Sequence, residues 1–245
     1  MDLVETCAAA VNLVGESIGG GLWTAERKRR IVESRLQAGR VLLEAIRAAA
    51  NPPQVLLQAS AVGYYGPQDD TPQTEISPAG IDFMAQVTTQ WEESTRAVEE
   101  RNIRRVIMRS GLVLHPKEGI LPSFLLPFRL FAGGPMGSGR QGVSWIHILD
   151  EARAMRFVIE RESSQGIYNF VSPNPVSNAN FGRALAKAIG RPYWMPAPAF
   201  ALRLALGEMS TLILDGQFVR PERLLGEGFS FSFPDLPGAL KDLLG

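Results

Sequence analysis

The stretch Ala9-Ala10-Val11-Asn12-Leu13-Val14-Gly15 decides the fold of this chain of 245 residues. It predicts a buried strand, within Met1 to Gly15, that runs into a turn of small residues. A parallel α/β sheet normally holds a dinucleotide at a Gly-rich turn after its first strand. The chain contains no G-x-G-x-x-G or G-x-x-G-x-x-G, and no strand closely precedes Gly19-Gly20-Gly21. We therefore interpret these three glycines as a flexible loop.

Helices and strands alternate after this opening. The spacing of apolar residues predicts an amphipathic helix from Thr24 to about Ala50, with Thr24 as its N-cap. A short strand is expected over Val55–Ser60, a second helix from Phe83 to Val98, and a further strand at Arg105–Met108. This order favours an α/β fold in which crossover helices connect the strands of a parallel sheet.

The order of elements becomes irregular beyond Gly111. Asp150 is the expected N-cap of a helix that reaches about Arg161, and Ile167–Val171 is the next expected strand. Either Ser177 or Asn178 caps a helix that Gly190 ends. In Phe229-Ser230-Phe231-Ser232-Phe233 the three aromatic side chains are expected on one side. This half of the chain therefore indicates α+β material added to the sheet.

Composition narrows the range of partners. Lys and Arg number 25, as do Asp and Glu, so net charge gives no argument for nucleic acid or for an anionic membrane. The basic run Arg27-Lys28-Arg29-Arg30 is interpreted as a solvated helix face. A single cysteine, Cys7, excludes an internal disulfide and a cysteine-based metal site, and His147 and His115 lie in no metal-ligand cluster.

No targeting or membrane segment is expected. Asp2 and Glu5 interrupt the N-terminus, which has no sustained apolar run with a basic flank. The apolar stretch Ala197–Leu206 is about half of the ~20 residues that a membrane span needs. We therefore expect a soluble, cytoplasmic protein.

Three expected strand ends are small or rich in glycine. They are Asn12–Gly15, Ser60–Gly66 and Arg109–Val113. Ligands of an open parallel sheet bind beyond the carboxyl ends of its strands, and small residues let a flat cofactor approach the backbone. Each turn alone is typical of an ordinary tight turn. The three together favour a cofactor cleft.

Motifs spread over the whole chain carry a resemblance to a known family. They are Asn12-Leu13-Val14-Gly15-Glu16, Trp23 with Ser34-Arg35, Ser60-Ala61-Val62-Gly63-Tyr64-Tyr65-Gly66, Arg109-Ser110-Gly111-Leu112-Val113-Leu114, Leu125–Leu130, Gly137–Gln141, Ser144–Ile148, Leu214–Gln217 and Phe231–Pro234. On these residues the chain resembles the atypical extended short-chain dehydrogenase/reductases. Within them it resembles the NAD-dependent epimerase/dehydratase-like branch sometimes labelled cell-division inhibitor.

The resemblance implies NADP(H) as cofactor and assigns residues to it. Leu13 and Val14 would line the adenosine half, with Arg30 and Arg35 within reach of it. Gly111 and Val113 would lie against the nicotinamide. Without the resemblance, the two arginines have an equally plausible interpretation as solvated helix residues.

The first of two departures from the family pattern concerns catalysis. Active members transfer the proton with a Tyr-x-x-x-Lys pair, whose Lys lowers the Tyr pKa. Phe83 and Val87 fall at those places, and neither side chain can carry a proton. Ser60 is then the expected active-site hydroxyl. Tyr64, or its neighbour Tyr65, is the candidate proton donor, although packing in a Gly-flanked turn explains either tyrosine as well.

The other departure concerns the beginning of the fold. In the family's strand order, 3-2-1-4-5-6, Leu3–Asn12 would be the fourth strand and an exposed edge, and the phosphate-binding glycines would precede it. The implied fold is thus a partial Rossmann-type parallel sheet without its first strands. Residues 1–115 would form the remaining nucleotide-binding half, 116–190 a mixed substrate region, and 191–245 a small C-terminal α+β lobe. An unpaired edge invites pairing with another chain, in a homo-oligomer or with a protein partner.

Two functions remain open from the sequence. One is an epimerase or reductase of an unknown small molecule, and the other is a non-catalytic scaffold or nucleotide-sensing protein in division or assembly. His147 and Asp150 resemble a catalytic pair by spacing. Structural hydrogen bonding at a strand end and a helix cap explains them better.

Overall fold

The computed structural model describes residues 4–245, so predictions that concern Met1 to Leu3 lie outside it. Its central sheet has the strand order β1 (Ala9–Asn12), β2 (Val55–Ala61), β3 (Arg104–Ser110) and β7 (Gly166–Phe170). All three pairings are parallel. The parallel α/β sheet predicted from the sequence is confirmed, and β1 lies at one edge of it.

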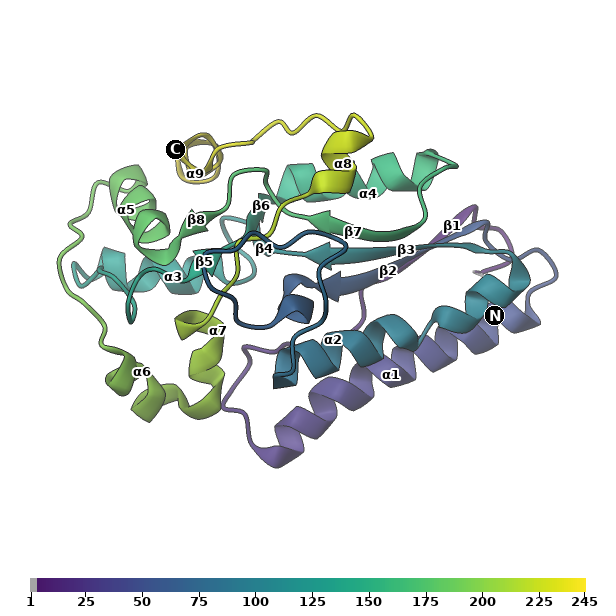
Figure 1. Ribbon diagram of the computed structural model, residues 1–245, viewed down its shortest axis with the longest axis horizontal. Coiled ribbons are helices and arrows are strands. Elements are labelled where there is room, and N and C mark those ends of the chain that lie inside the picture. The colour runs from purple at the N-terminus through teal and green to yellow at the C-terminus, as the bar shows by residue number, and fades with distance from the viewer. Residues whose placement is uncertain (1–3) are drawn as a thin grey trace.

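Helices cover both faces of this sheet (Figure 1). Helices α1 (Ala25–Ala48) and α2 (Phe83–Glu93) lie on one face, and α4 (Ile148–Glu160) and α8 (Glu222–Gly226) lie on the other. Strand β2 is buried along its length except at its last residue, because alternate side chains enter different cores. Leu57 packs in the cluster that contains residues of α4, and Leu56 packs with Ile46 of α1.

Shorter elements complete the chain. Strands β4 and β6 form a parallel pair, and β5 and β8 an antiparallel one. The C-terminal segment, residues 211–245, then returns across the sheet and ends in α9 (Figure 1). The bounds of these elements are η1 Val62–Tyr65, η2 Arg96–Arg101, β4 Leu112–Leu114, α3 Leu121–Arg129, β5 Gly142–Val143, β6 Trp145–His147, β8 Val176–Ser177, α5 Asn178–Ala188, α6 Ala199–Leu206, η3 Gly207–Ser210, α7 Thr211–Leu214 and α9 Leu236–Leu244.

The expectation of a buried opening strand is wrong. Strand β1 ends at Asn12, which is its one buried residue. Val11, Leu13 and Val14 are 42%, 57% and 60% exposed. The cause is the position of β1, which pairs with β2 on one side and has no neighbouring strand on the other within the described sheet.

Two helix predictions need correction. The helix expected from Phe83 to Val98 ends at Glu93, because Thr95 adopts a non-helical conformation (φ −114°, ψ 7°) before the 3₁₀ turn η2. Asp150, the predicted N-cap of α4, lies inside the helix. The cap is His147, whose Nδ1 accepts a hydrogen bond from the Leu149 amide. The predicted caps Thr24 and Ser177 are confirmed.

Asp150 and His147, which resemble a catalytic pair by spacing, both contact the C-terminal segment instead. The Asp150 carboxylate accepts hydrogen bonds from the backbone amides of Ser232 (2.9 Å) and Phe233 (2.8 Å). The His147 ring stacks on the Phe233 ring, and its Nε2 lies 3.2 Å from Asp242. The three phenylalanines therefore do not share one side. Phe229 packs in the hydrophobic cluster between the sheet and α4, whereas Phe233 packs in the hydrophobic cluster formed by α5 and α9.

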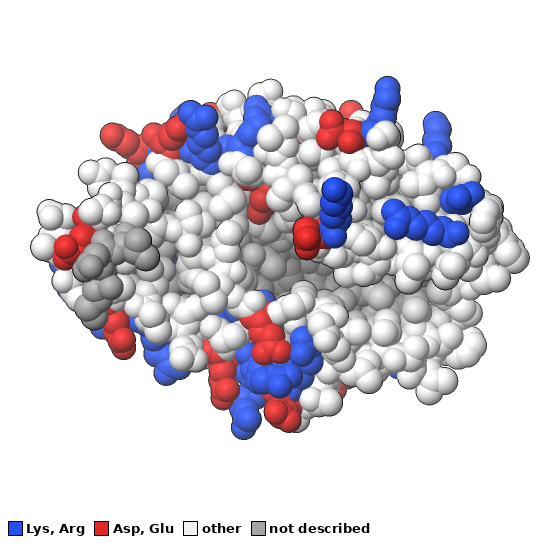
Figure 2. Space-filling view, turned by 180° about the vertical axis from the view of Figure 1, so that it is seen from behind, with Lys and Arg blue, Asp and Glu red and all other residues white. Residues whose placement is uncertain are grey.

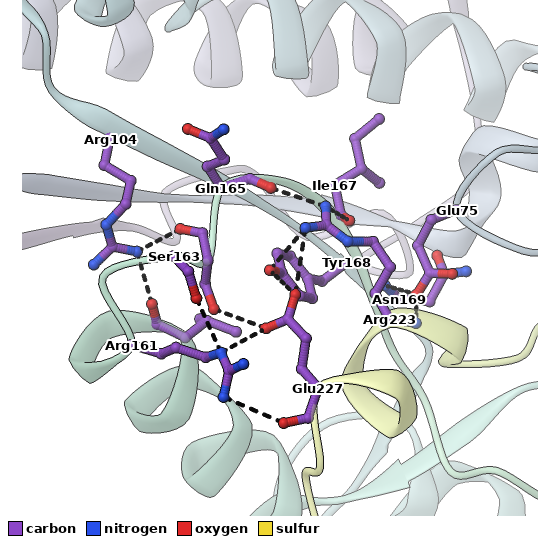
Figure 3. Close-up of polar contacts among 12 residues, drawn as sticks. Glu75, Arg104, Arg161, Ser163, Gln165, Ile167, Tyr168, Asn169, Arg223 and Glu227 are labelled. Atoms are coloured by element: carbon purple, nitrogen blue, oxygen red, sulfur yellow. Dashed lines mark hydrogen bonds and ion pairs between the residues drawn. The ribbon is translucent and has the colours of Figure 1, made fainter.

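A partly buried polar network joins α8 to β7 (Figure 3). Glu227 accepts a hydrogen bond of 2.6 Å from the Tyr168 hydroxyl and one of 3.0 Å from Ser164 Oγ. Arg161 and Arg223 lie 3.3 and 3.4 Å from its carboxylate oxygens. One carboxylate thus joins the C-terminal segment to the strand and to the loop before it.

Glu227→Ala is expected to lower the free energy of unfolding by about 2–3 kcal/mol, because it leaves the buried hydroxyls of Tyr168 and Ser164 without this acceptor. Urea denaturation measures this effect. Glu222→Ala is the matched control on α8, since Glu222 forms an exposed ion pair with Arg220 and should change stability by less than about 1 kcal/mol. Equal effects of the two substitutions would contradict the role given to Glu227.

Candidate functional site

A pocket of about 240 Å³ lies at the carboxyl ends of β2 and β3. This is where an open parallel sheet binds ligands. Its walls come from segments far apart in the sequence. They are Ala61–Gly63 at the end of β2, Ser110–Leu112 at the end of β3, Gln141–Ser144 in and around β5, and residues of the C-terminal segment between Thr211 and Gln217.

Five glycines line this pocket, and one of them, Gly111, lies against a neighbouring backbone segment. A Cβ atom at Gly111 would lie 2.5 Å from the Ser144 carbonyl oxygen and 2.8 Å from a Val171 methyl carbon. The Ser144 carbonyl accepts a hydrogen bond from the Leu112 amide and cannot move away freely. Glycine at position 111 is therefore required by close approach of two backbone segments.

The charged residues that line the pocket are acidic. Asp82 and Asp215 contribute carboxylates, and no Lys or Arg belongs to the lining within the described chain. Asp82 also caps α2 by accepting a hydrogen bond from the Ala85 amide. Burial raises the pKa of Asp215, Arg203 opposes that rise, and Asp82 adds to it. An anionic group would have no cationic partner here, whereas a hydroxyl or an amine could donate to Asp215.

Ser110 connects the pocket to a buried carboxyl. Its hydroxyl donates a hydrogen bond of 2.6 Å to Glu151 Oε1 on α4, and Glu151 Oε2 is buried with no hydrogen-bond partner in the described structure. Burial raises the pKa of Glu151 to about 7, against the hydrogen bond from Ser110, which lowers it. Glu151 therefore changes its charge near neutral pH.

This raised pKa predicts a pH-dependent stability. Between about pH 4.5 and 7 the unfolded chain releases the Glu151 proton while the folded chain retains it, so the free energy of unfolding falls as pH rises through this window. The total loss is about 3 kcal/mol. Glu151→Gln should remove that loss, as measured by urea denaturation across this range. Glu160→Gln, at an exposed position of α4, should retain it; an unchanged slope in Glu151→Gln would contradict the raised pKa.

Ser60, Tyr64 and Tyr65 gather around Arg109, and none of them lines the pocket. Ser60 Oγ donates a hydrogen bond of 2.6 Å to Glu92. Arg109 donates to both Glu92 oxygens and to the Tyr65 hydroxyl, and its guanidinium carbon lies 3.2 Å from the centre of the Tyr64 ring. Burial raises the pKa of the Tyr65 phenol. The structure thus places these three side chains beside an ion pair, and their proposed catalytic role stays a prediction.

The residues assigned to the nicotinamide separate in the structure. Gly111 lines the pocket, whereas Val113 on β4 packs against the core above the sheet. Leu13 and Val14 lie on the exposed segment that follows β1.

The two arginines assigned to the cofactor meet at Glu16. Arg35 is buried: its Nη1 donates to the carbonyls of Ile31 (2.8 Å) and Glu16 (3.1 Å), and its guanidinium lies over the Trp91 ring. Arg30 is half-exposed, and its Nε lies 3.6 Å from the Glu16 carboxylate. Of the two, Arg30 has the more accessible guanidinium.

Phe83 and Val87, which the resemblance leads us to expect at the places of the family's proton-transfer pair, are packing residues. Phe83 contacts Trp23 edge-on with ring centres 5.1 Å apart, and Val87 is buried in the same cluster. Sequence reasoning missed the pair of Ser110 and Glu151. Ser110 was recognised only as part of a strand-end turn, and nothing in the helix pattern distinguished Glu151 from a solvated residue.

The residues present fit the two halves of a nicotinamide dinucleotide at two different places. A pocket of about 240 Å³ admits a flat ring and a small ligand but not a complete dinucleotide. The exposed Leu13 and Val14, with Arg30 nearby on α1, offer apolar and cationic groups beside the open edge of the sheet. Figure 2 shows one face of the molecule hollowed near its middle, with charged residues lying mainly along its upper and lower margins.

Metal-binding clusters and membrane-spanning helices are both absent from the described part of the chain. Residues 4–245 contain no group of three or more His, Cys, Asp or Glu placed to hold a metal ion. Nor does any helix there combine the length and the apolar character that crossing a membrane requires.

A parallel α/β sheet with its pocket at the carboxyl ends of the strands defines the class of Rossmann-like proteins. The NAD dependent epimerase/dehydratase family matches residues 2–170, and the chain belongs to this family. Residues 197–243 match a domain of unknown function, DUF1731. The resemblance to the epimerase-like branch, inferred from the sequence motifs, is thereby confirmed.

Several relatives are similar over nearly the whole chain. Mouse epimerase family protein SDR39U1 is 40% identical over 242 residues, which cover 97% of this chain and 82% of the relative. Epimerase family protein YfhF of Bacillus subtilis is 40% identical over 235 residues, which cover 96% of this chain and 77% of the relative.

Solved structures agree with the fold. The crystal structure of human epimerase family protein SDR39U1 (isoform 2) with NADPH superposes with a TM-score of 0.93 at 36% identity, over 98% of this chain and 82% of the human one. The UDP-glucose 4-epimerase of Thermus thermophilus, in complex with NAD, reaches a TM-score of 0.76 at 17% identity, over 97% of this chain and 76% of the other, and supports the fold alone.

Proposed function

We propose that this chain binds NADP(H) along the carboxyl edge of its sheet and acts as an oxidoreductase or epimerase on a small, uncharged, polar molecule. The observation that carries the proposal is the pocket at the ends of β2 and β3, in a chain whose human relative was crystallised with NADPH. Bound NADPH would supply a hydride. Leu13, Val14 and Arg30 would hold the adenosine half, and Gly111 would border the nicotinamide.

The pocket residues support an uncharged substrate. Its size suits a molecule of a few heavy atoms beside a flat ring, and its charged groups, Asp82 and Asp215, would repel phosphate and carboxylate. The Asp215 carboxylate accepts no hydrogen bond from the described residues, so it is available to a substrate hydroxyl. Ser60 and Tyr64 would support the site from the Arg109 network without contact with the substrate.

A fluorescence titration with NADPH tests cofactor binding. The wild-type chain should bind with a dissociation constant in the micromolar range, and Arg30→Glu should weaken binding by about tenfold through charge reversal near the adenosine half. Arg29→Glu is the matched control, because the neighbouring Arg29 is exposed and pairs with Glu33 on the same helix. No fluorescence change at millimolar NADPH would contradict the proposal.

A second function is an NADP(H)-sensing protein without turnover. The apolar Phe83 and Val87, at the places of the family's proton-transfer pair, favour it. Binding of NADPH without its oxidation by any uncharged aldehyde or ketone would select this alternative.

A further inference from the structure

We propose that Ser110 is the catalytic residue that exchanges a proton with the substrate oxygen, and that Glu151 is the positioning residue whose protonation sets the direction of this exchange. The inference rests on the proposed function, because it needs an oxygen-bearing substrate in the pocket. It assigns to this chain a proton donor other than a tyrosine.

The geometry singles out Ser110 among the pocket hydroxyls. Ser144 Oγ donates to the Gln217 carbonyl and accepts from the Val219 amide, so both its roles are filled. Thr211 Oγ1 donates to the Glu208 carbonyl. Ser110 alone among these three hydroxyls is bonded to a group that can gain or lose a proton.

The protonation of Glu151 reverses the hydrogen bond between the two side chains. An ionised Glu151 can only accept, so the Ser110 hydroxyl must donate to it and presents lone pairs to the pocket. A protonated Glu151 can donate to Ser110 Oγ, which frees the Ser110 proton to point into the pocket. The first state suits a substrate hydroxyl, and the second suits a substrate carbonyl.

The titratable groups near Glu151 are paired with other residues or lie on the opposite face of the sheet. On α4, Asp150 pairs with Arg153 at 2.7 Å, and His147 at the helix start faces Asp242. Strands β2 and β4, which pack against α4, carry no titratable residue. On β3, Arg109 is bonded to Glu92, and its side chain leaves the strand on the face opposite to that of Ser110.

Ser110, Glu151 and water together account for every proton that moves in a reduction. The substrate carbon receives a hydride, which the proposed function attributes to NADPH, and its oxygen takes the proton of Ser110 Oγ. Ser110 Oγ takes the carboxyl proton of Glu151 along their 2.6 Å hydrogen bond. The Glu151 carboxylate regains a proton from water after the product leaves. Oxidation follows the reverse order.

Infrared difference titration between about pH 5 and pH 9 tests the carboxyl directly, in the absence of NADPH. We expect a protonated carboxyl band that is lost near pH 7 in the wild type and in Glu160→Gln, is missing in Glu151→Gln, and shifts in Ser110→Ala. A band that persists in Glu151→Gln, or no such band in the wild type, would overturn the inference.

The second arm follows NADPH oxidation with glyceraldehyde as an uncharged carbonyl probe. The rate per bound NADPH should fall by about tenfold from pH 6 to pH 8 in the wild type and stay level in Glu151→Gln. Ser110→Ala should be at least about a hundredfold slower at both pH values. A wild-type pH profile in Glu151→Gln overturns the inference, as does a wild type that binds NADPH and reduces no glyceraldehyde. Loss of NADPH binding contradicts the proposed function instead, and the carboxyl band is unaffected by that outcome.

Discussion

Arg109→Met is expected to lower the free energy of unfolding by about 3–5 kcal/mol, because it leaves the Glu92 carboxylate without its cation. Arg109 is 1% exposed and donates to Glu92 through Nε (2.8 Å) and Nη2 (2.9 Å). Burial alone would lower the pKa of Arg109, but the hydrogen bonds and charge of Glu92 raise it above its ordinary value. Urea denaturation at neutral pH measures the effect.

A double variant separates the ion pair from simple loss of packing. Arg109→Met combined with Glu92→Met removes both charges and should be less destabilising than the sum of the two single substitutions by at least about 1 kcal/mol. Arg96→Met is the control, because Arg96 forms an exposed pair with Glu93 and should cost less than about 1 kcal/mol. Additive single effects would show that the pair is not coupled.

Gly111→Ala is expected to destabilise the chain by about 1–3 kcal/mol and to reduce the size of the pocket. The added methyl group would lie 2.5 Å from the Ser144 carbonyl oxygen, so β4 or β5 must shift. Thermal unfolding measures the stability, and NADPH titration measures the binding that the pocket supports.

A second glycine provides the control for this substitution. Gly238 lies in α9, where a Cβ atom meets nothing within 4 Å. Gly238→Ala should therefore stabilise the chain by about 0.5–1 kcal/mol through helix propensity, with NADPH binding unchanged. An equally stable Gly111→Ala variant would contradict the close approach of the two backbone segments.

Local patterns predicted the sheet because they report local structure. The run Val55–Ser60 is apolar enough for a strand buried on both faces, and Thr24 and Ser177 cap helices through bonds to amides three residues ahead. Such features depend on neighbours along the chain. The helix break at Thr95 and the exposure of β1 depend on packing and on sheet position, which these patterns do not contain.

The pocket could be predicted only in part. Its place at the strand ends followed from the parallel topology, and Gly111, which was predicted to border the nicotinamide, lines it. The choice of Ser60 as its hydroxyl was not supported by position, because side chains alternate along β2 and Ser60 points to Glu92 while Ala61 lines the pocket. The bond between Ser110 and Glu151 joins residues 41 positions apart, and no periodicity within one element reports such a contact.

Arg35 shows the same limit on a helix. Its position suggested either a solvated side chain or a cofactor contact, because sequence gives no account of what lies beside a helix face. In the structure its guanidinium lies 4.7 Å from the centre of the Trp91 ring of α2. Tertiary packing therefore decides whether a helical arginine meets water, ligand or protein.

The comparison of glyceraldehyde with glyceraldehyde 3-phosphate tests the central claim most directly, since the two differ by one anionic group. NADPH oxidation is followed with each at the same concentration. We predict oxidation with the uncharged aldehyde at a kcat/KM at least about tenfold higher, because the pocket holds Asp82 and Asp215 and no cation within its described lining. A preference for the phosphorylated aldehyde, or no NADPH oxidation with either, would contradict an oxidoreductase of small uncharged substrates.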